Sequence, residues 1–273
     1  MKVVRHYACL TSEELCDFLD RNKVSFQQDC STVGMGRVYF DVFESDCFFP
    51  ELAKIELKDC VITKQVRYSK KEIESAQWLT CNPTTAKVNL TNQDKTFWVS
   101  EQYGTGKAYH RMLSGMPFYI SKRVAHNGKQ HFFASYDAPN QLFCTEYAKS
   151  MLQRINLPIS FEPVLNSKTE MPIGDLYALH IQYVLPVKAL DLSNSEETFA
   201  CPVCGSQTFL PPFSLQIRKE YLIDTPGIFR TEAVFGWGGN YSAPINIISN
   251  EIYLELVEKR LVRGLEIEPI SLI

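Results

Sequence analysis

The sequence predicts a sheet-rich α+β protein made of two related halves, each ending in a strand–helix–strand unit. Three observations lead to this fold class. Residues 136–164 resemble residues 241–270, alternating apolar runs are common while long helical patterns are few, and hydrophobic residues make up 45% of the 273-residue chain. That content is ordinary for a globular protein and suffices for a substantial core. We therefore expect an internal duplication and two domains, residues 1–165 and 166–273.

The first helix is expected near the amino terminus, over residues 12–20. The segment Thr11-Ser12-Glu13-Glu14 has the form of a capping box, with Thr11 as N-cap and Glu14 at position N3. Charged residues break the apolar run before it, which is not the pattern of a signal peptide. No apolar stretch approaches the roughly 20 residues that a membrane span needs. The sequence therefore predicts a cytoplasmic protein without a membrane partner, whose nine cysteines are reduced thiols.

Most of the remaining chain has the patterns of strands. Apolar residues alternate with polar ones over residues 37–43, 96–99, 130–135 and 175–184. A second helix is expected over residues 70–79, because Ser69 precedes a helix-forming run as its N-cap. Glycine clusters punctuate these segments and predict turns.

The two repeats share a physical pattern as well as identities. Each begins with Ala-Pro, continues into a short apolar strand, and then presents a polar N-cap: Thr145 in the first copy, Ser249 or Asn250 in the second. A helix with apolar residues at helical spacing follows. Pro158 is expected to end the first helix, and Gly264 to end the second at a C′ position. A closing strand ending in Glu-Pro completes each unit.

The pentapeptide Cys201-Pro202-Val203-Cys204-Gly205 has the form of a metal-binding turn. Two thiolates on one side of a tight turn are half of a structural zinc ribbon, and tetrahedral zinc needs two further ligands. No second Cys-x-x-Cys pair exists, so the others would come from scattered residues such as Cys60, Cys81 or His180, or from another chain. Two alternatives stay open: Cys201 and Cys204 hold one structural zinc, or they are a relic pair without metal.

Residues 107–131 form a basic stretch. It contains five lysines and arginines, three histidines and no acidic residue, and Phe118 and Tyr119 lie among them. Such a stretch indicates either a nucleic-acid surface or a solvated hairpin that faces an acidic partner. We prefer the hairpin, because the net charge of −3 gives no general attraction for nucleic acid.

No motif of a known catalytic site occurs in the chain. There is no nucleophile elbow and no His-Glu-x-x-His. The segment Gly104-Thr105-Gly106-Lys107 lacks the first glycine and the final hydroxyl residue of a phosphate loop. We therefore expect a binding protein and not an enzyme, with no cofactor apart from the zinc considered above.

In its second half the chain resembles the bacterial double-CXXCG proteins and the wider group of immunity proteins of polymorphic toxin systems. The resemblance rests on the knuckle at 201–205, on Ile247-Ile248-Ser249-x-x-Ile252-x-x-x-Leu256, and on Arg263-Gly264-Leu265-x-x-Glu268-Pro269. The family's first knuckle is degenerate here. The resemblance implies a protein that binds and neutralises a cognate toxin domain by stoichiometric occlusion. Its expected contact residues are Trp237, Phe118 and Tyr119, because large aromatic side chains dominate protein interfaces.

Overall fold

The computed structural model forms two compact units, Met1–Glu72 and Ile73–Ile273. Strands hold 46% of the residues and helices 21%, which confirms the sheet-rich α+β class. The sequence instead predicted a domain boundary between residues 165 and 166. These two residues lie within one strand, and the boundary between the compact units lies between Glu72 and Ile73. The structure describes residues 1–29, 36–84, 86–90, 97–103, 106–111, 117–121, 129–135, 141–193, 195, 197–200, 207–210, 212, 214–222, 227–236 and 242–273.

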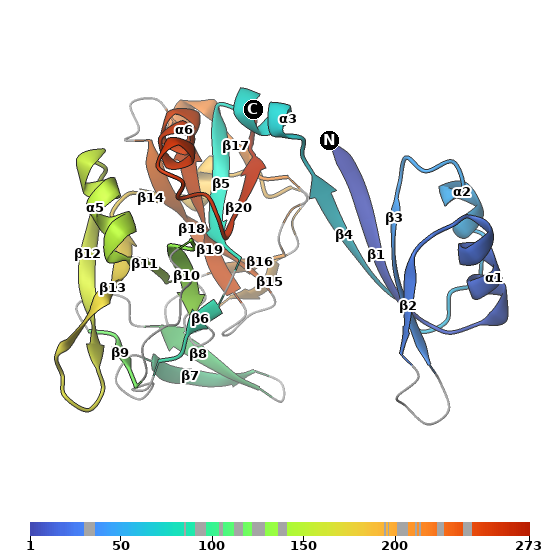
Figure 1. The fold of residues 1–273 in the computed structure, drawn as a ribbon, viewed down its shortest axis with the longest axis horizontal. Coiled ribbons are helices and arrows are strands. Elements are labelled where there is room, and N and C mark those ends of the chain that lie inside the picture. Colours follow the sequence, from blue (N-terminus) through green and yellow to red (C-terminus); the bar gives the residue numbers. More distant parts are fainter. Residues whose placement is uncertain are drawn as a thin grey trace. The chain divides into compact units, whose positions relative to one another are not determined.

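The first unit has the element order βαββαβ (Figure 1). Its strands pair antiparallel in the order β2-β3-β1-β4. Strand β3 lies between β1 and β2, and β1 lies between β3 and β4, so two split βαβ crossovers interlock. The elements are β1 (Lys2–Leu10), α1 (Glu13–Arg21), β2 (Phe26–Asp29), β3 (Arg37–Phe43), α2 (Phe49–Leu52) and β4 (Val61–Arg67).

Helix α1 begins one residue later than the sequence predicted. Ser12, with an extended backbone, is the N-cap, and its hydroxyl accepts a hydrogen bond from the Leu15 amide at 3.2 Å. The predicted cap, Thr11, is wrong, because its hydroxyl instead donates to the Gly36 carbonyl at 2.7 Å. The buried face of α1, with Leu15 and Phe18, packs on the sheet and forms the core of this unit.

Helix α3 (Lys70–Ser75) spans the boundary between the two units. The predicted cap is confirmed as a reciprocal capping box: the Glu72 amide donates to the Ser69 hydroxyl at 3.3 Å, and the Ser69 amide donates to the Glu72 carboxylate at 2.8 Å. The helix ends at Ser75 and not at 79, because Trp78 begins strand β5 (Trp78–Pro83).

The second unit contains two large sheets. The first has the order β6-β10-β11-β13-β12-β9, and the second has the order β15-β16-β18-β19-β5-β20 with β14 beside β18. The strands of the first sheet are β6 (Ala86–Val88), β9 (Tyr119–Ile120), β10 (Phe132–Ser135), β11 (Leu142–Thr145), β12 (Ile159–Asn166) and β13 (Pro172–Ile181). Those of the second, besides β5, are β14 (Val184–Leu185), β15 (Glu197–Ala200), β16 (Gln207–Phe209), β18 (Ile228–Gly236), β19 (Ser242–Ser249) and β20 (Leu265–Pro269).

Smaller elements complete this unit. Two strand pairs lie outside the large sheets: β7 with β8, and β17 with β21. The bounds of the remaining elements are β7 (Phe97–Tyr103), β8 (Gly106–Arg111), β17 (Gln216–Ile217), β21 (Ser271–Leu272), α5 (Glu146–Arg154), α6 (Asn250–Glu258) and the 3-10 turns η1 (Val187–Ala189) and η2 (Lys219–Tyr221).

Two strand–helix–strand units stand at the predicted places, β11–α5–β12 and β19–α6–β20 (Figure 1). Thr145 and Ser249 are the N-caps, and each hydroxyl accepts a hydrogen bond from the amide three residues later. In each unit a third strand lies between the two and antiparallel to both: β13 between β11 and β12, and β5 between β19 and β20. Both are therefore split βαβ crossovers.

Helices α5 and α6 share one hydrophobic core. Leu152 of α5 and Ile252 and Leu256 of α6 belong to the same buried cluster, together with strand residues from both large sheets, such as Leu79 and Leu142. The two sheets are therefore joined through the helices that cover them. This packing brings the beginning of α5 close to the end of α6.

Candidate functional site

A cavity of about 870 Å³ lies where the beginning of α5 meets the segment that follows α6. We call it the α5–α6 pocket. Aliphatic and aromatic surface makes up much of its wall, and charged groups occur around it. The lining residues are Lys129, His131, Thr145, Glu146, Tyr147, Asp175, Val257, Lys259, Arg260, Val262 and Arg263.

Two buried polar residues form the inner part of the pocket. His131 is 9% exposed and Thr145 is 3% exposed. The His131 Nδ1 atom lies 2.9 Å from the Thr145 hydroxyl, and the Thr145 amide donates to the His131 carbonyl at 3.0 Å. The same hydroxyl caps α5 by accepting from the Ala148 amide. These hydrogen bonds fix the His131 ring and the Thr145 hydroxyl relative to the first turn of α5.

Tyr147 connects the two helices across the pocket. Its hydroxyl donates to the Lys259 carbonyl at 3.3 Å, and the centroid of its ring lies 4.8 Å from the centroid of the His131 ring. The side chain is nevertheless 45% exposed, and Val257 on α6 is 38% exposed. The mouth of the pocket therefore presents apolar surface to solvent.

The end of α6 places an arginine at the pocket. The Arg260 amide donates to the Val257 carbonyl and the Leu261 amide to the Leu256 carbonyl, which is a Schellman motif with Arg260 at C′. Arg260 has φ +58°, a left-handed conformation that favours glycine or asparagine. The predicted C′ residue, Gly264, is wrong, because the helix ends at Glu258, well before it.

The charged residues around the pocket differ in whether they already have a charged or hydrogen-bonding partner. Four cationic residues line it, against Glu146 and Asp175. The Glu146 carboxylate is already engaged: a hydrogen bond from Tyr177, with others from Lys149 and Ser150, holds its pKa below the usual range. In the described part of the chain, Arg260 and Arg263 make no ion pair. Such a pocket can bind an anionic group next to an apolar one.

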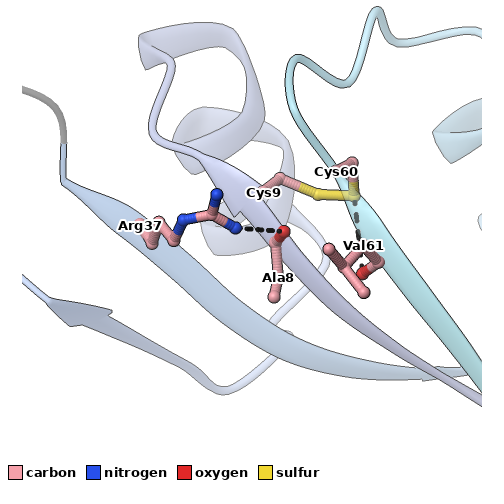
Figure 2. Close-up of a disulfide and its surroundings, with 5 residues drawn as sticks. All are labelled: Ala8, Cys9, Arg37, Cys60 and Val61. Carbon is pink, nitrogen blue, oxygen red and sulfur yellow. Dashed lines mark hydrogen bonds between the residues drawn. A yellow bond between two sulfur atoms is a disulfide. The ribbon is translucent and has the colours of Figure 1, made fainter. Parts of the chain in front are cut away.

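A disulfide joins Cys9 and Cys60 in the first unit, as Figure 2 shows. Strands β1 and β4 pair with Ala8 opposite Val61, and the two cysteines are the next residues in this register. The expectation of reduced thiols is therefore wrong for this pair. The Arg37 guanidinium donates to the Ala8 carbonyl at 3.3 Å and ties β3 to the same end of β1.

The aromatic residues expected at an interface have different positions. Phe118 is 2% exposed and packs edge-to-face on Phe143 with ring centroids 5.3 Å apart, so its ring belongs to the core. Tyr119 is partly buried and begins β9, which pairs with β12. Trp237 lies outside the described residues.

The knuckle cysteines Cys201 and Cys204 also lie outside the described residues. Among the residues that the structure describes, no group of three or more His, Cys, Asp or Glu side chains is arranged to hold a metal ion. Of the three further ligands suggested by the sequence, Cys60 is in the disulfide, and burial raises the pKa of the Cys81 thiol to about 12. His180 Nε2 lies 3.3 Å from the Glu162 carboxylate, without hydrogen-bond geometry.

Sequence reasoning found only part of the pocket. Lys129 and His131 belong to the basic stretch 107–131, and Arg263 belongs to the motif that carries the family resemblance, whereas the sequence patterns considered above do not include Arg260. Comparisons with protein-family models, with curated proteins and with solved structures find no match to this chain. Within the described ranges, no helix is long and apolar enough to cross a membrane.

Proposed function

We propose that this chain is a cytoplasmic immunity protein that binds and neutralises a cognate bacterial toxin domain by stoichiometric occlusion. The resemblance of its second half to double-CXXCG and immunity proteins supports the proposal. The observation that carries it is the α5–α6 pocket, where exposed Tyr147 and Val257 lie beside Arg260 and Arg263. Aromatic and arginine side chains are enriched at protein interfaces. The protein acts by binding and has no catalytic turnover of its own.

The proposal includes an internal duplication of the strand–helix–strand unit. Equivalent N-caps at Thr145 and Ser249 support it, as does the same order of strands around each helix. The copies have diverged in the source of the interposed strand: β13 follows its unit in the chain, whereas β5 precedes its unit by many residues. The duplication explains why two similar helices share one core.

Co-expression with the product of the adjacent gene tests the immunity role. A toxin domain encoded there should arrest growth when expressed alone, and the present chain should restore growth and co-purify with it at a 1:1 ratio. The proposal fails if the chain neither restores growth nor forms a complex.

The alternative is a zinc-ribbon-like protein that binds nucleic acid through the basic stretch 107–131. One observation favours it, since Lys129 and His131 of this stretch lie with Arg260 and Arg263 at the same pocket. Binding to a phosphate backbone would fall steeply between low and moderate salt. Negligible binding to single-stranded RNA at low salt would exclude this role, and zinc analysis of the purified protein would separately decide whether Cys201 and Cys204 hold metal.

A further inference from the structure

Apolar side chains are exposed around the mouth of the α5–α6 pocket. Tyr147 and Val257 contribute to the wall, and Leu254, 49% exposed, lies three residues before Val257 on α6. Residues three apart on a helix lie on the same face. The exposed apolar surface therefore continues from the pocket along one face of α6, and burial in a complex would remove it from water.

Two guanidinium groups border this apolar surface. The neighbouring cation Lys259 lies 2.8 Å from Glu258, whereas Arg260 and Arg263 are exposed and have no ion pair within the described residues. A guanidinium presents several donors in a planar fork that matches a carboxylate. The pocket thus offers a place for an apolar side chain and, beside it, two groups suited to a carboxylate.

We propose that the α5–α6 pocket docks an acidic segment of a protein partner, with an apolar side chain in the cavity and a neighbouring carboxylate on Arg260 and Arg263. This inference rests on the proposed function, because it assigns the surface through which that partner binds. The charge of the two arginines and the apolar lining together define the occupant.

The surrounding charges favour a protein segment over a nucleic acid. Glu146 and Asp175 lie in the pocket wall, and Glu258 follows the exposed Leu254 by four residues on the same face of α6. A nucleic acid carries a negative charge at every phosphate and would pass these carboxylates along its length. A peptide needs only one or two carboxylates at the arginines, so its remaining residues avoid that repulsion.

The chain itself suggests a variant that keeps its fold. Asn156 occupies the C′ position of α5 with φ +56°, and Arg260 occupies the C′ position of α6 with φ +58°. Asparagine tolerates this conformation well. The double variant R260N/R263Q therefore removes two charges while preserving the helix end. A matched control, K168Q/K219Q, removes two exposed lysines of the same unit that do not line the pocket.

The probe is a fluorescent peptide of alternating glutamate with leucine and phenylalanine, titrated with the full-length protein and followed by fluorescence anisotropy. We expect the native protein to bind it and to bind the glutamine version of the peptide about tenfold more weakly, because that version loses the charge-assisted contacts to the arginines; tenfold corresponds to about 1.4 kcal/mol. R260N/R263Q should lose about tenfold in affinity, and K168Q/K219Q should stay within about twofold of the native protein.

The inference is overturned if the native protein does not bind the peptide, if K168Q/K219Q loses as much affinity as R260N/R263Q, or if single-stranded RNA binds more tightly than the peptide through the same arginines. Complete displacement of the peptide by millimolar inorganic phosphate would also overturn it, in favour of a small-anion site. The co-expression assay separates this inference from the immunity role. R260N/R263Q that still binds and neutralises the toxin refutes the docking surface alone, whereas peptide binding by a native protein that binds no toxin refutes the immunity role alone.

Discussion

The substitution Glu268→Gln is expected to stabilise the second unit at neutral and alkaline pH but not at acidic pH. Glu268 lies in β20 opposite the buried Thr80 of β5, and its side chain is partly buried. Burial, with a smaller contribution from the negative charge of Glu266, raises the pKa of Glu268 from 4.5 to about 7. The ionised carboxylate is therefore less favourable in the folded protein than in the unfolded chain.

The sign and size of the effect follow from proton linkage. Between pH 4.5 and pH 7 the folded protein binds more protons at Glu268 than the unfolded chain, so the free energy of unfolding falls as pH rises through this window. The difference between a pKa of about 7 and one of 4.5 corresponds to about 3.5 kcal/mol, at about 1.4 kcal/mol for each pKa unit. Because the side chain keeps some contact with water, screening reduces the expected loss to roughly 1–2 kcal/mol.

Thermal unfolding of the native protein and Glu268→Gln, at pH 4 and pH 8, measures this loss. The glutamine stays neutral, so the variant should match the native protein at pH 4 and unfold about 2–8 °C higher at pH 8, at roughly 2–4 °C for each kcal/mol. Glu162→Gln is the matched control: Glu162 precedes a proline in β12, as Glu268 does in β20, but the Glu162 carboxylate lies 3.3 Å from the His180 ring. If the unfolding temperatures of the native protein and Glu268→Gln differ by the same amount at pH 4 and pH 8, the Glu268 carboxylate is not desolvated in the folded protein.

Three further predictions concern stability. Cys60→Ala removes the disulfide that closes a 51-residue separation, and the chain-entropy model predicts a loss of about 4 kcal/mol in the unfolding free energy of the first unit, measurable by urea denaturation. Thr145→Ala and Ser249→Ala should each cost about 1 kcal/mol by loss of a helix cap, and equal costs in urea unfolding would be expected of corresponding positions. Gly264→Ala should destabilise by about 1 kcal/mol or more, because Gly264 has φ +82° and a Cβ atom would approach Gln130 Nε2 to 2.6 Å. Adding Gln130→Ala should recover only part of that loss in thermal unfolding, since the backbone strain remains.

Local physics made several elements predictable from the sequence. The polar caps of α5 and α6 precede apolar residues at helical spacing, and the cap of α3 belongs to a capping box; such patterns need no tertiary information. The alternating run at residues 37–43 likewise became β3, since one face of that strand is buried. Errors of one residue, as at Thr11, arise where two adjacent hydroxyl residues compete for the cap and a distant carbonyl, here that of Gly36, binds one of them.

The sequence by itself determined the helices with their caps, the strand-rich composition and the two strand–helix–strand units. Only the tertiary structure decided how they assemble. Strand β5 lies between β19 and β20, and the Asn246 side-chain amide donates a hydrogen bond to Asn82 Oδ1, although the two residues are 164 positions apart in the sequence. The α5–α6 pocket has the same origin, because Lys129, Tyr147 and Arg260 come from separate segments. Contacts of this kind depend on which apolar faces pack together, and no local pattern in the chain records that choice.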